Sequence, residues 1–86
     1  MFRWNEEKNN ILKAGRNITF EEIIENGKIL AKQLNKSINH PNQWEFHIKY
    51  QDYIYRVPYV TEENGDIFLK TIFKDRKLLK TYKDLL

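Results

Sequence analysis

Residues 44–60 have the sequence WEFHIKYQDYIYRVPYV, in which apolar and polar residues alternate along two runs. Alternation with a period of two is typical of β-strands that bury one face. Gln51 and Asp52 separate the runs, and two residues are the length of a tight hairpin turn. The segment therefore predicts two antiparallel strands, over 44–50 and 53–60.

A two-residue turn also predicts which residues of the two strands face each other. On one face Ile48 lies opposite Tyr55, and further aromatic and aliphatic pairs make this face a candidate core. On the other face His47 lies opposite Arg56. We therefore expect an imidazole beside a guanidinium on the polar side of the sheet, where Arg56 can equally serve as a cross-strand partner of Glu45.

Two helices are predicted before the hairpin. A helix over 5–14 has acidic residues in its first turn, and Gly15 offers a C-terminal stop. A second helix over 20–26 follows a capping box, in which the Thr19 hydroxyl accepts a hydrogen bond from the amide of Glu22. The first half of the chain is therefore expected to be mainly helical.

The remaining elements complete the outline of the domain. We expect strands over 2–4, 28–35 and 67–73, a turn over 62–66 and a final helix capped by Asp75. The sequence thus predicts a single α+β domain over residues 1–86. Two N-terminal helices are expected to pack on an antiparallel sheet of about four strands, followed by a short C-terminal helix.

The composition excludes several classes of protein. The 86 residues contain no cysteine, which rules out a disulfide framework, a thiol nucleophile and a cysteine metal cluster. Two histidines, His40 and His47, are too few for a metal site without clustered carboxylates, so we expect no metal and no cofactor. The first eight residues turn charged before any apolar run forms, and no apolar run approaches the ~20 residues of a membrane-spanning helix. A cytoplasmic protein without membrane contact is therefore expected.

Basic residues concentrate near the end of the chain. Residues 1–66 carry nine basic and ten acidic side chains, whereas residues 67–86 carry six basic and two acidic ones. A cationic segment on a nearly neutral body indicates a polyanion or an acidic protein as the partner. The same pattern also occurs where a lysine-rich helix end is simply solvated.

The polar face of the hairpin is suited to an RNA phosphate. Cleavage of RNA without a metal needs a group that takes the 2′-OH proton, cations that stabilise the phosphorane, and a proton donor for the 5′ oxygen. Arginine and lysine can supply the cations, and histidine or tyrosine can transfer the protons. His47 and Arg56 are therefore candidates, although strand histidines are more often exposed surface residues and strand tyrosines more often packing residues.

Four segments resemble a known family. They are FRWNEEKN at 2–9, KAG at 13–15, ITFEE at 18–22 and FLKTIFKDRK at 68–77. BrnT-type toxins begin with F-x-W-(D/N)-x-x-K-N, a K-H-G element and a hydrophobic-x-F-E-E element. Their last strand leads from a basic residue through an apolar pair to an arginine at a helix start. The chain is similar to this family over most of its length, with Ala14 where the family has the histidine of K-H-G.

The resemblance implies a RelE-like ribonuclease toxin of a bacterial type II toxin–antitoxin system. Such toxins are metal-free α+β proteins that cut RNA and inhibit translation and growth. The implied partners are a cognate antitoxin of the ribbon-helix-helix type and RNA, either free or on the ribosome. DNA would be contacted only through the antitoxin.

The candidate site residues are cations, histidines and one tyrosine. The catalytic candidates are His40, His47, Arg56, Lys70 and Arg76, and the RNA-binding candidates are Lys74, Lys77, Lys80 and Tyr82. The arginines and lysines would bind phosphate, a histidine would transfer protons, and the tyrosine could stack on a base. Lys70 and Arg76 match basic positions of the family's last strand and flank a strand-to-helix junction, where a helix N-terminus favours anions.

Two other functions fit the same residues. A catalytically degenerate member of the family could hold its antitoxin without cutting RNA, and Ala14 favours this alternative. A mobile-element inhibitor could instead bind another protein through the tyrosine-rich hairpin.

Overall fold

The hairpin predicted from the alternating pattern forms the middle of the sheet. In the computed structural model, which describes residues 1–34 and 43–85, β3 (Trp44–Tyr50) pairs antiparallel with β4 (Tyr53–Thr61). Gln51 takes a positive φ of 55° in the turn between them, as tight hairpin turns require.

The register of this hairpin is the predicted one. Ile48 is paired with Tyr55, and His47 is paired with Arg56. Because successive side chains of a strand point to opposite faces, the first pair lies on the apolar face and the second on the polar face. This register places the candidate residues of both strands side by side.

Two helices precede the hairpin, as the capping signals predict. The chain begins with β1 (Phe2–Trp4), α1 (Glu6–Arg16) and α2 (Phe20–Asn26). The side chains of Asn5 and Thr19 each accept an amide hydrogen bond from the first turn of the helix that follows, which satisfies donors that a helix start leaves open. The second helix has the predicted bounds.

The first helix ends later than predicted. The chain continues in helical conformation through Gly15, and the residue in the left-handed region is Asn17, with a φ of 55°. The amide of Asn17 donates to the carbonyl of Lys13 and closes the helix. Asparagine tolerates this conformation better than most residues, so Gly15 is not needed as the stop.

The sheet is larger than predicted and is mixed rather than antiparallel. The described residues form six strands, in the order β1-β5-β4-β3-β2, with β6 beside β4. The three strands not yet given are β2 (Lys28–Leu34), β5 (Ile67–Leu69) and β6 (Phe73–Lys74). β1 pairs with β5 in parallel, an arrangement that needs a long connection between the strands. Helices α1 and α2 and the rest of the sheet supply that connection.

The strand predicted over 67–73 is interrupted. Tyr59 pairs with Leu69, whereas Arg56 pairs with Phe73, so the segment between them holds one residue more than β4 does. Pro58 lies in this stretch of β4 and has no amide hydrogen to donate to a sheet ladder. The segment therefore leaves the sheet after β5 and rejoins it as β6.

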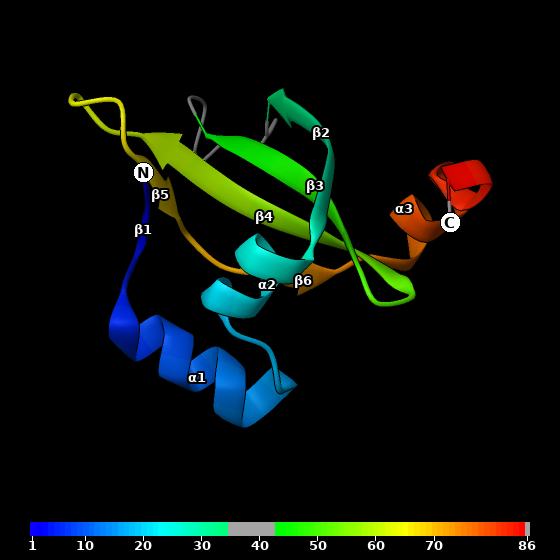
Figure 1. Cartoon of the computed structure of the whole chain (residues 1–86), viewed down its shortest axis with the longest axis horizontal. Helices are drawn as coiled ribbons and strands as arrows, with labels where there is room; N and C mark the ends of the chain where they lie inside the picture. The colour runs from blue at the N-terminus through cyan, green and yellow to red at the C-terminus, as the bar shows by residue number, and fades with distance from the viewer. Residues whose placement is uncertain (35–42, 86) are drawn as a thin grey trace.

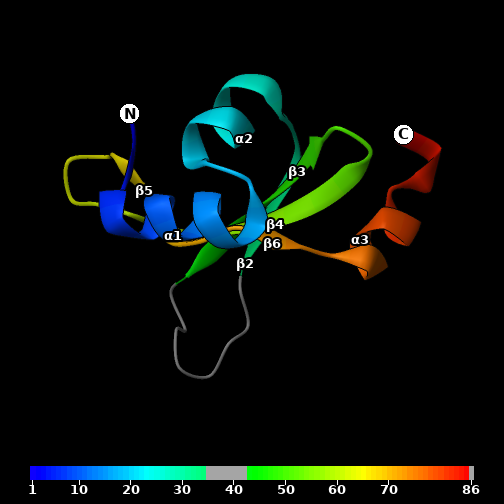
Figure 2. The ribbon, with the colours of Figure 1, turned by 90° about the horizontal axis from the view of Figure 1, so that it is seen from below.

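The core lies between the helices and one face of the sheet. Figures 1 and 2 show α1 and α2 on the same side of the strands. Large side chains that are at most 2% exposed fill this layer: Leu12, Phe20, Ile23, Ile48, Val57, Leu69 and Ile72. The Trp4 ring stacks on that of Phe20, so the first strand is anchored to this core.

The last helix lies apart from the first two. α3 (Arg76–Thr81) is followed by a 3₁₀ turn over Lys83–Leu85, and Figure 1 shows it at the end of the molecule opposite β5 and the N-terminus. The side chain of Asp75 caps α3, as predicted, by accepting from the amides of two residues in its first turn. Among the helices described, none is both long and apolar enough to span a membrane.

Candidate functional site

The polar face of the hairpin carries three ionisable side chains in contact with one another. Glu45 and His47 are alternate residues of β3 and therefore point to the same face, and Arg56 is paired with His47 on β4. The alternation that builds the core on one side thus assembles this group on the other.

Glu45 is the centre of the group. Its carboxylate accepts from Arg56 through two parallel hydrogen bonds, Nε to Oε2 at 2.8 Å and NH2 to Oε1 at 2.9 Å. It also contacts Nε2 of His47 at 2.8 Å. Burial raises the pKa of Glu45, but the hydrogen bonds from Arg56 and His47 outweigh burial and hold that pKa below its usual value. The carboxylate therefore stays ionised at neutral pH.

His47 connects this carboxylate to the end of the chain. Its Nδ1 lies 2.8 Å from the hydroxyl of Tyr82, and the two rings meet edge to face. An ionised carboxylate only accepts hydrogen bonds, so Nε2 carries the hydrogen that points to Glu45. In the neutral imidazole Nδ1 then accepts, and Tyr82 donates to it.

The inner part of this hydrogen-bonded group is buried, and its outer part is exposed to solvent. Glu45 and His47 are both 2% exposed, whereas the side chain of Arg56 is 36% exposed and Tyr82 is half-buried. A solute could therefore touch Tyr82 and Arg56, while His47 and Glu45 act from behind them.

Asp75 joins the outer side of Arg56. Its Oδ2 lies 3.6 Å from NH1 of Arg56, while its Oδ1 caps α3. The hydrogen bonds to Glu45, together with the charges of Glu45 and Asp75, raise the pKa of Arg56 above its usual value. The pairing of Arg56 with Glu45, considered from the sequence, is confirmed.

The structure brings together three of the residues predicted from the sequence: His47, Arg56 and Tyr82. Four other predicted cations are exposed: Lys70, Arg76, Lys77 and Lys80. The first lies between β5 and β6 and the other three in α3. Within residues 1–34 and 43–85, no hydrogen bond or ion pair joins these four side chains to the group around Glu45.

The last two predicted residues have different positions. Lys74 is paired with Tyr55 and so belongs to the opposite face of the sheet. His40 lies outside the described residues.

Sequence reasoning missed the joint role of Glu45 and the position of Tyr82. The alternation along β3 places Glu45 on the same face as His47, so the contact between them could have been predicted from the sequence. Nothing in the local pattern indicates that a tyrosine 35 positions after His47 returns to it, because that contact depends on the path of β6 and α3.

The contacts from Tyr82 to Glu45 have the order hydroxyl, imidazole, carboxylate. In this order a carboxylate orients an imidazole, and the imidazole exchanges a proton with the hydroxyl.

Among the described residues, no three histidine or carboxylate side chains are grouped so that they could hold a metal ion. Comparison with family models, curated proteins and solved structures finds no match to this chain.

Proposed function

We propose that the protein is a metal-independent endoribonuclease on a RelE-like fold, acting as the toxin of a type II toxin–antitoxin pair. The observation that supports this proposal is the contact chain from Tyr82 through His47 to Glu45, with Arg56 beside it. A proton-transferring hydroxyl and a partly exposed guanidinium supply two of the three groups that cleavage of RNA by its own 2′-OH requires.

In the proposed reaction the 2′ oxygen attacks the adjacent phosphorus and the bond from phosphorus to the 5′ oxygen breaks. The hydroxyl of Tyr82 takes the 2′ proton as it passes its own proton to Nδ1 of His47. Arg56 stabilises the negative charge on the phosphorane. The 5′ oxygen takes a proton from water, and the hydroxide that remains takes back the proton of His47 through Tyr82, which restores both side chains. The products are a 2′,3′-cyclic phosphate and a 5′-hydroxyl.

The resemblance to BrnT-type toxins supports the biological setting of the proposal. A cognate antitoxin of the ribbon-helix-helix type would neutralise the protein and contact DNA on behalf of the pair. The RNA would be cut free or on the ribosome, and the exposed cations of α3 would hold its backbone.

The test is RNA cleavage by the purified chain with EDTA present, with the new ends mapped chemically. The Tyr82→Phe variant keeps the ring and loses only the hydroxyl, and cleavage should fall by about 10²-fold or more. Tyr53→Phe, a half-buried tyrosine of the opposite face, is the matched control and should cut at the rate of the unchanged protein. Equal cleavage by both variants would remove Tyr82 from the reaction, and no new ends from the unchanged protein would refute the proposal.

A protein-binding module without catalysis is the second candidate. Three large apolar side chains are exposed on the neighbouring strands β2 and β3: Ile29, Leu34 and Trp44. β2 is an edge strand among those described, so its outer side can pair with a strand of an antitoxin. Binding of the antitoxin without RNA cleavage would favour this candidate over the nuclease.

A further inference from the structure

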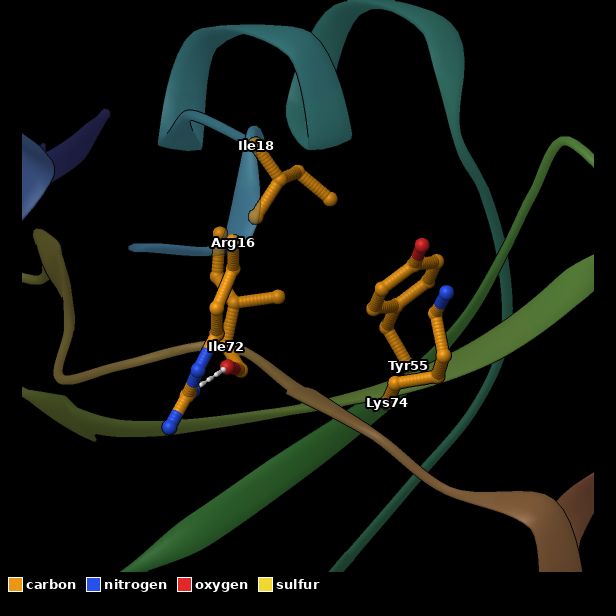
Figure 3. Close-up of a pocket in the computed structure, with 5 residues that line it drawn as sticks. All are labelled: Arg16, Ile18, Tyr55, Ile72 and Lys74. Carbon is orange, nitrogen blue, oxygen red and sulfur yellow. Dashed lines mark hydrogen bonds between the residues drawn. The ribbon is translucent and has the colours of Figure 1, made fainter. Parts of the chain in front are cut away.

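A second group of cations surrounds a cavity on the helix side of the sheet. Two adjoining hollows of about 280 and 250 Å³ share four lining residues: Arg16, Ile18, Tyr55 and Lys74. Figure 3 shows these side chains, with Arg16 on one side of the space and Tyr55 and Lys74 on the other. Because the lining is shared, the hollows form one site, which we call the Arg16–Lys74 cavity.

Arg16 and Lys74 are held in place by neighbouring groups that do not neutralise their positive charge. NH1 of Arg16 donates to the carbonyl of Ile72, and its guanidinium carbon lies 5.5 Å from the ring centroid of Phe73. Nζ of Lys74 lies 4.2 Å from the ring centroid of Tyr53. In the described part of the chain neither cation is within ion-pair distance of a carboxylate.

The carboxylate at the cavity already has partners. Glu22 accepts from Lys13 at 3.5 Å and from the hydroxyl of Tyr50 at 3.1 Å. Burial raises its pKa, but these contacts and the hydroxyl of Thr19 lower it overall. Glu22 is therefore ionised and offsets the charge of Lys13, so the cavity retains the charges of Arg16 and Lys74.

The wall of the cavity next to these cations is apolar. Ile18, Tyr55 and Ile72 line the larger hollow and are 3%, 9% and 1% exposed. Sites that bind small molecules combine an apolar wall with a few polar groups that fix the orientation of the ligand, in volumes of about 300–1,000 Å³. Each hollow alone is close to the lower limit of that range, and together they fit a small organic anion.

We infer that the Arg16–Lys74 cavity binds a mononucleotide. Its phosphate contacts Lys74 through charge-assisted hydrogen bonds, the positive charge of Arg16 on the other side of the space attracts it further, and its base packs against Ile18, Tyr55 and Ile72. A free phosphate would leave the apolar wall unused. The cavity lies across the sheet from His47 and Arg56, since Tyr55 and Arg56 are consecutive residues of β4.

Binding can be measured by titrating the isotope-labelled chain with adenosine 5′-monophosphate and following its amide NMR signals. Saturable shifts are expected at residues of the cavity. Arg16→Gln and Lys74→Gln should each weaken binding about tenfold, whereas Lys28→Gln, an exposed lysine of β2, should leave it unchanged. Adenosine alone and inorganic phosphate alone should both bind more weakly than the mononucleotide.

Three results would overturn the inference. Inorganic phosphate binding as tightly as the mononucleotide would show a simple anion site, and a short RNA shifting the same signals more tightly would show part of an RNA channel. An absence of saturable shifts at the cavity would refute it altogether. The readout involves no RNA cleavage, so its outcome is independent of the proposed nuclease activity.

Discussion

Glu45 holds together the hydrogen-bonded side chains on the polar face of the hairpin. Moving a carboxylate out of water is unfavourable by several kcal/mol unless hydrogen bonds and opposite charge offset it. Here one buried carboxylate accepts from both Arg56 and His47. The same carboxylate orients the imidazole that contacts Tyr82, so stability and the proposed chemistry rest on one side chain.

Replacing Glu45 by glutamine should therefore reduce both stability and its dependence on pH. Because the pKa of Glu45 is lowered in the folded state, its contribution is present above the usual value of 4.5 and is lost as the pH falls below it. At pH 7 Glu45→Gln should lower the free energy of unfolding by about 2–3 kcal/mol. Urea unfolding from pH 7 to pH 3 should show the variant losing less stability on acidification than the unchanged protein.

The control for this experiment is Glu25→Gln, at an exposed position of α2. It should follow the pH profile of the unchanged protein. Some acid sensitivity should persist in Glu45→Gln, since the pKa values of Glu22 and Asp66 are also lowered. Parallel profiles for Glu45→Gln and the unchanged protein would show that the buried carboxylate does not stabilise the fold.

At the scale of single elements, the two glycines near the helix ends have opposite surroundings. Gly15 lies in α1 with nothing within 4 Å of an added Cβ atom. At Gly27, which closes α2, an added Cβ would lie 2.4 Å from the carbonyl oxygen of Ile23 and 2.5 Å from Cγ2 of Ile48. Gly27 therefore permits the close approach of α2 to β3, whereas Gly15 has no such role.

Alanine at these two positions should change stability in opposite directions. Gly27→Ala should lower the free energy of unfolding by about 2 kcal/mol, because the backbone and a core side chain must move. Gly15→Ala should raise it by about 0.5–1 kcal/mol, because alanine is the better helix former. Thermal or urea unfolding measures both, and a destabilising Gly15→Ala would contradict the view that its Cβ meets open space.

The elements that could be predicted are those fixed by local signals. The β3–β4 register follows from a two-residue turn and alternation, and the start of α2 follows from Thr19 and Glu22, which are only three residues apart in the sequence. The interruption between β5 and β6 depends on the partner strand, where Pro58 offers no amide hydrogen. The sequence predicts that α1 stops at Gly15, but the left-handed residue that ends it is Asn17, because asparagine also tolerates this conformation.

At the scale of the whole molecule, contacts between distant parts of the chain determine the site. The alternating pattern predicts that His47 and Arg56 are neighbours, but it does not state what covers them. The contact of His47 with Tyr82 requires the return of β6 to β4 and the direction of α3. The Arg16–Lys74 cavity likewise joins the end of α1 to β4 and β6, so no single segment of the sequence could indicate it.

The same long-range contacts suggest how α3 is retained on the molecule. The helix has six residues and none of them is buried, so it is too short to be stable alone in water. In the described part of the chain three contacts join its ends to the hairpin. The amide of Asp75 donates to the carbonyl of Ile54, the carboxylate of Asp75 pairs with Arg56, and the hydroxyl of Tyr82 contacts His47. Opening of α3 should therefore precede global unfolding.

Native-state hydrogen exchange should reveal this order. Amides of β3 and β4 should exchange only through global unfolding, and those at the end of α3 through local opening. Tyr82→Phe removes one hydrogen bond worth about 1 kcal/mol, so it should speed exchange in α3 by about fivefold. The same variant should leave the amides at the start of α1 unchanged, because that part of the chain lies at the end of the molecule opposite α3 (Figure 1). Unchanged exchange in α3 would mean that Asp75 alone holds the helix, and the hydroxyl of Tyr82 would then be free to serve the proposed reaction without any structural cost.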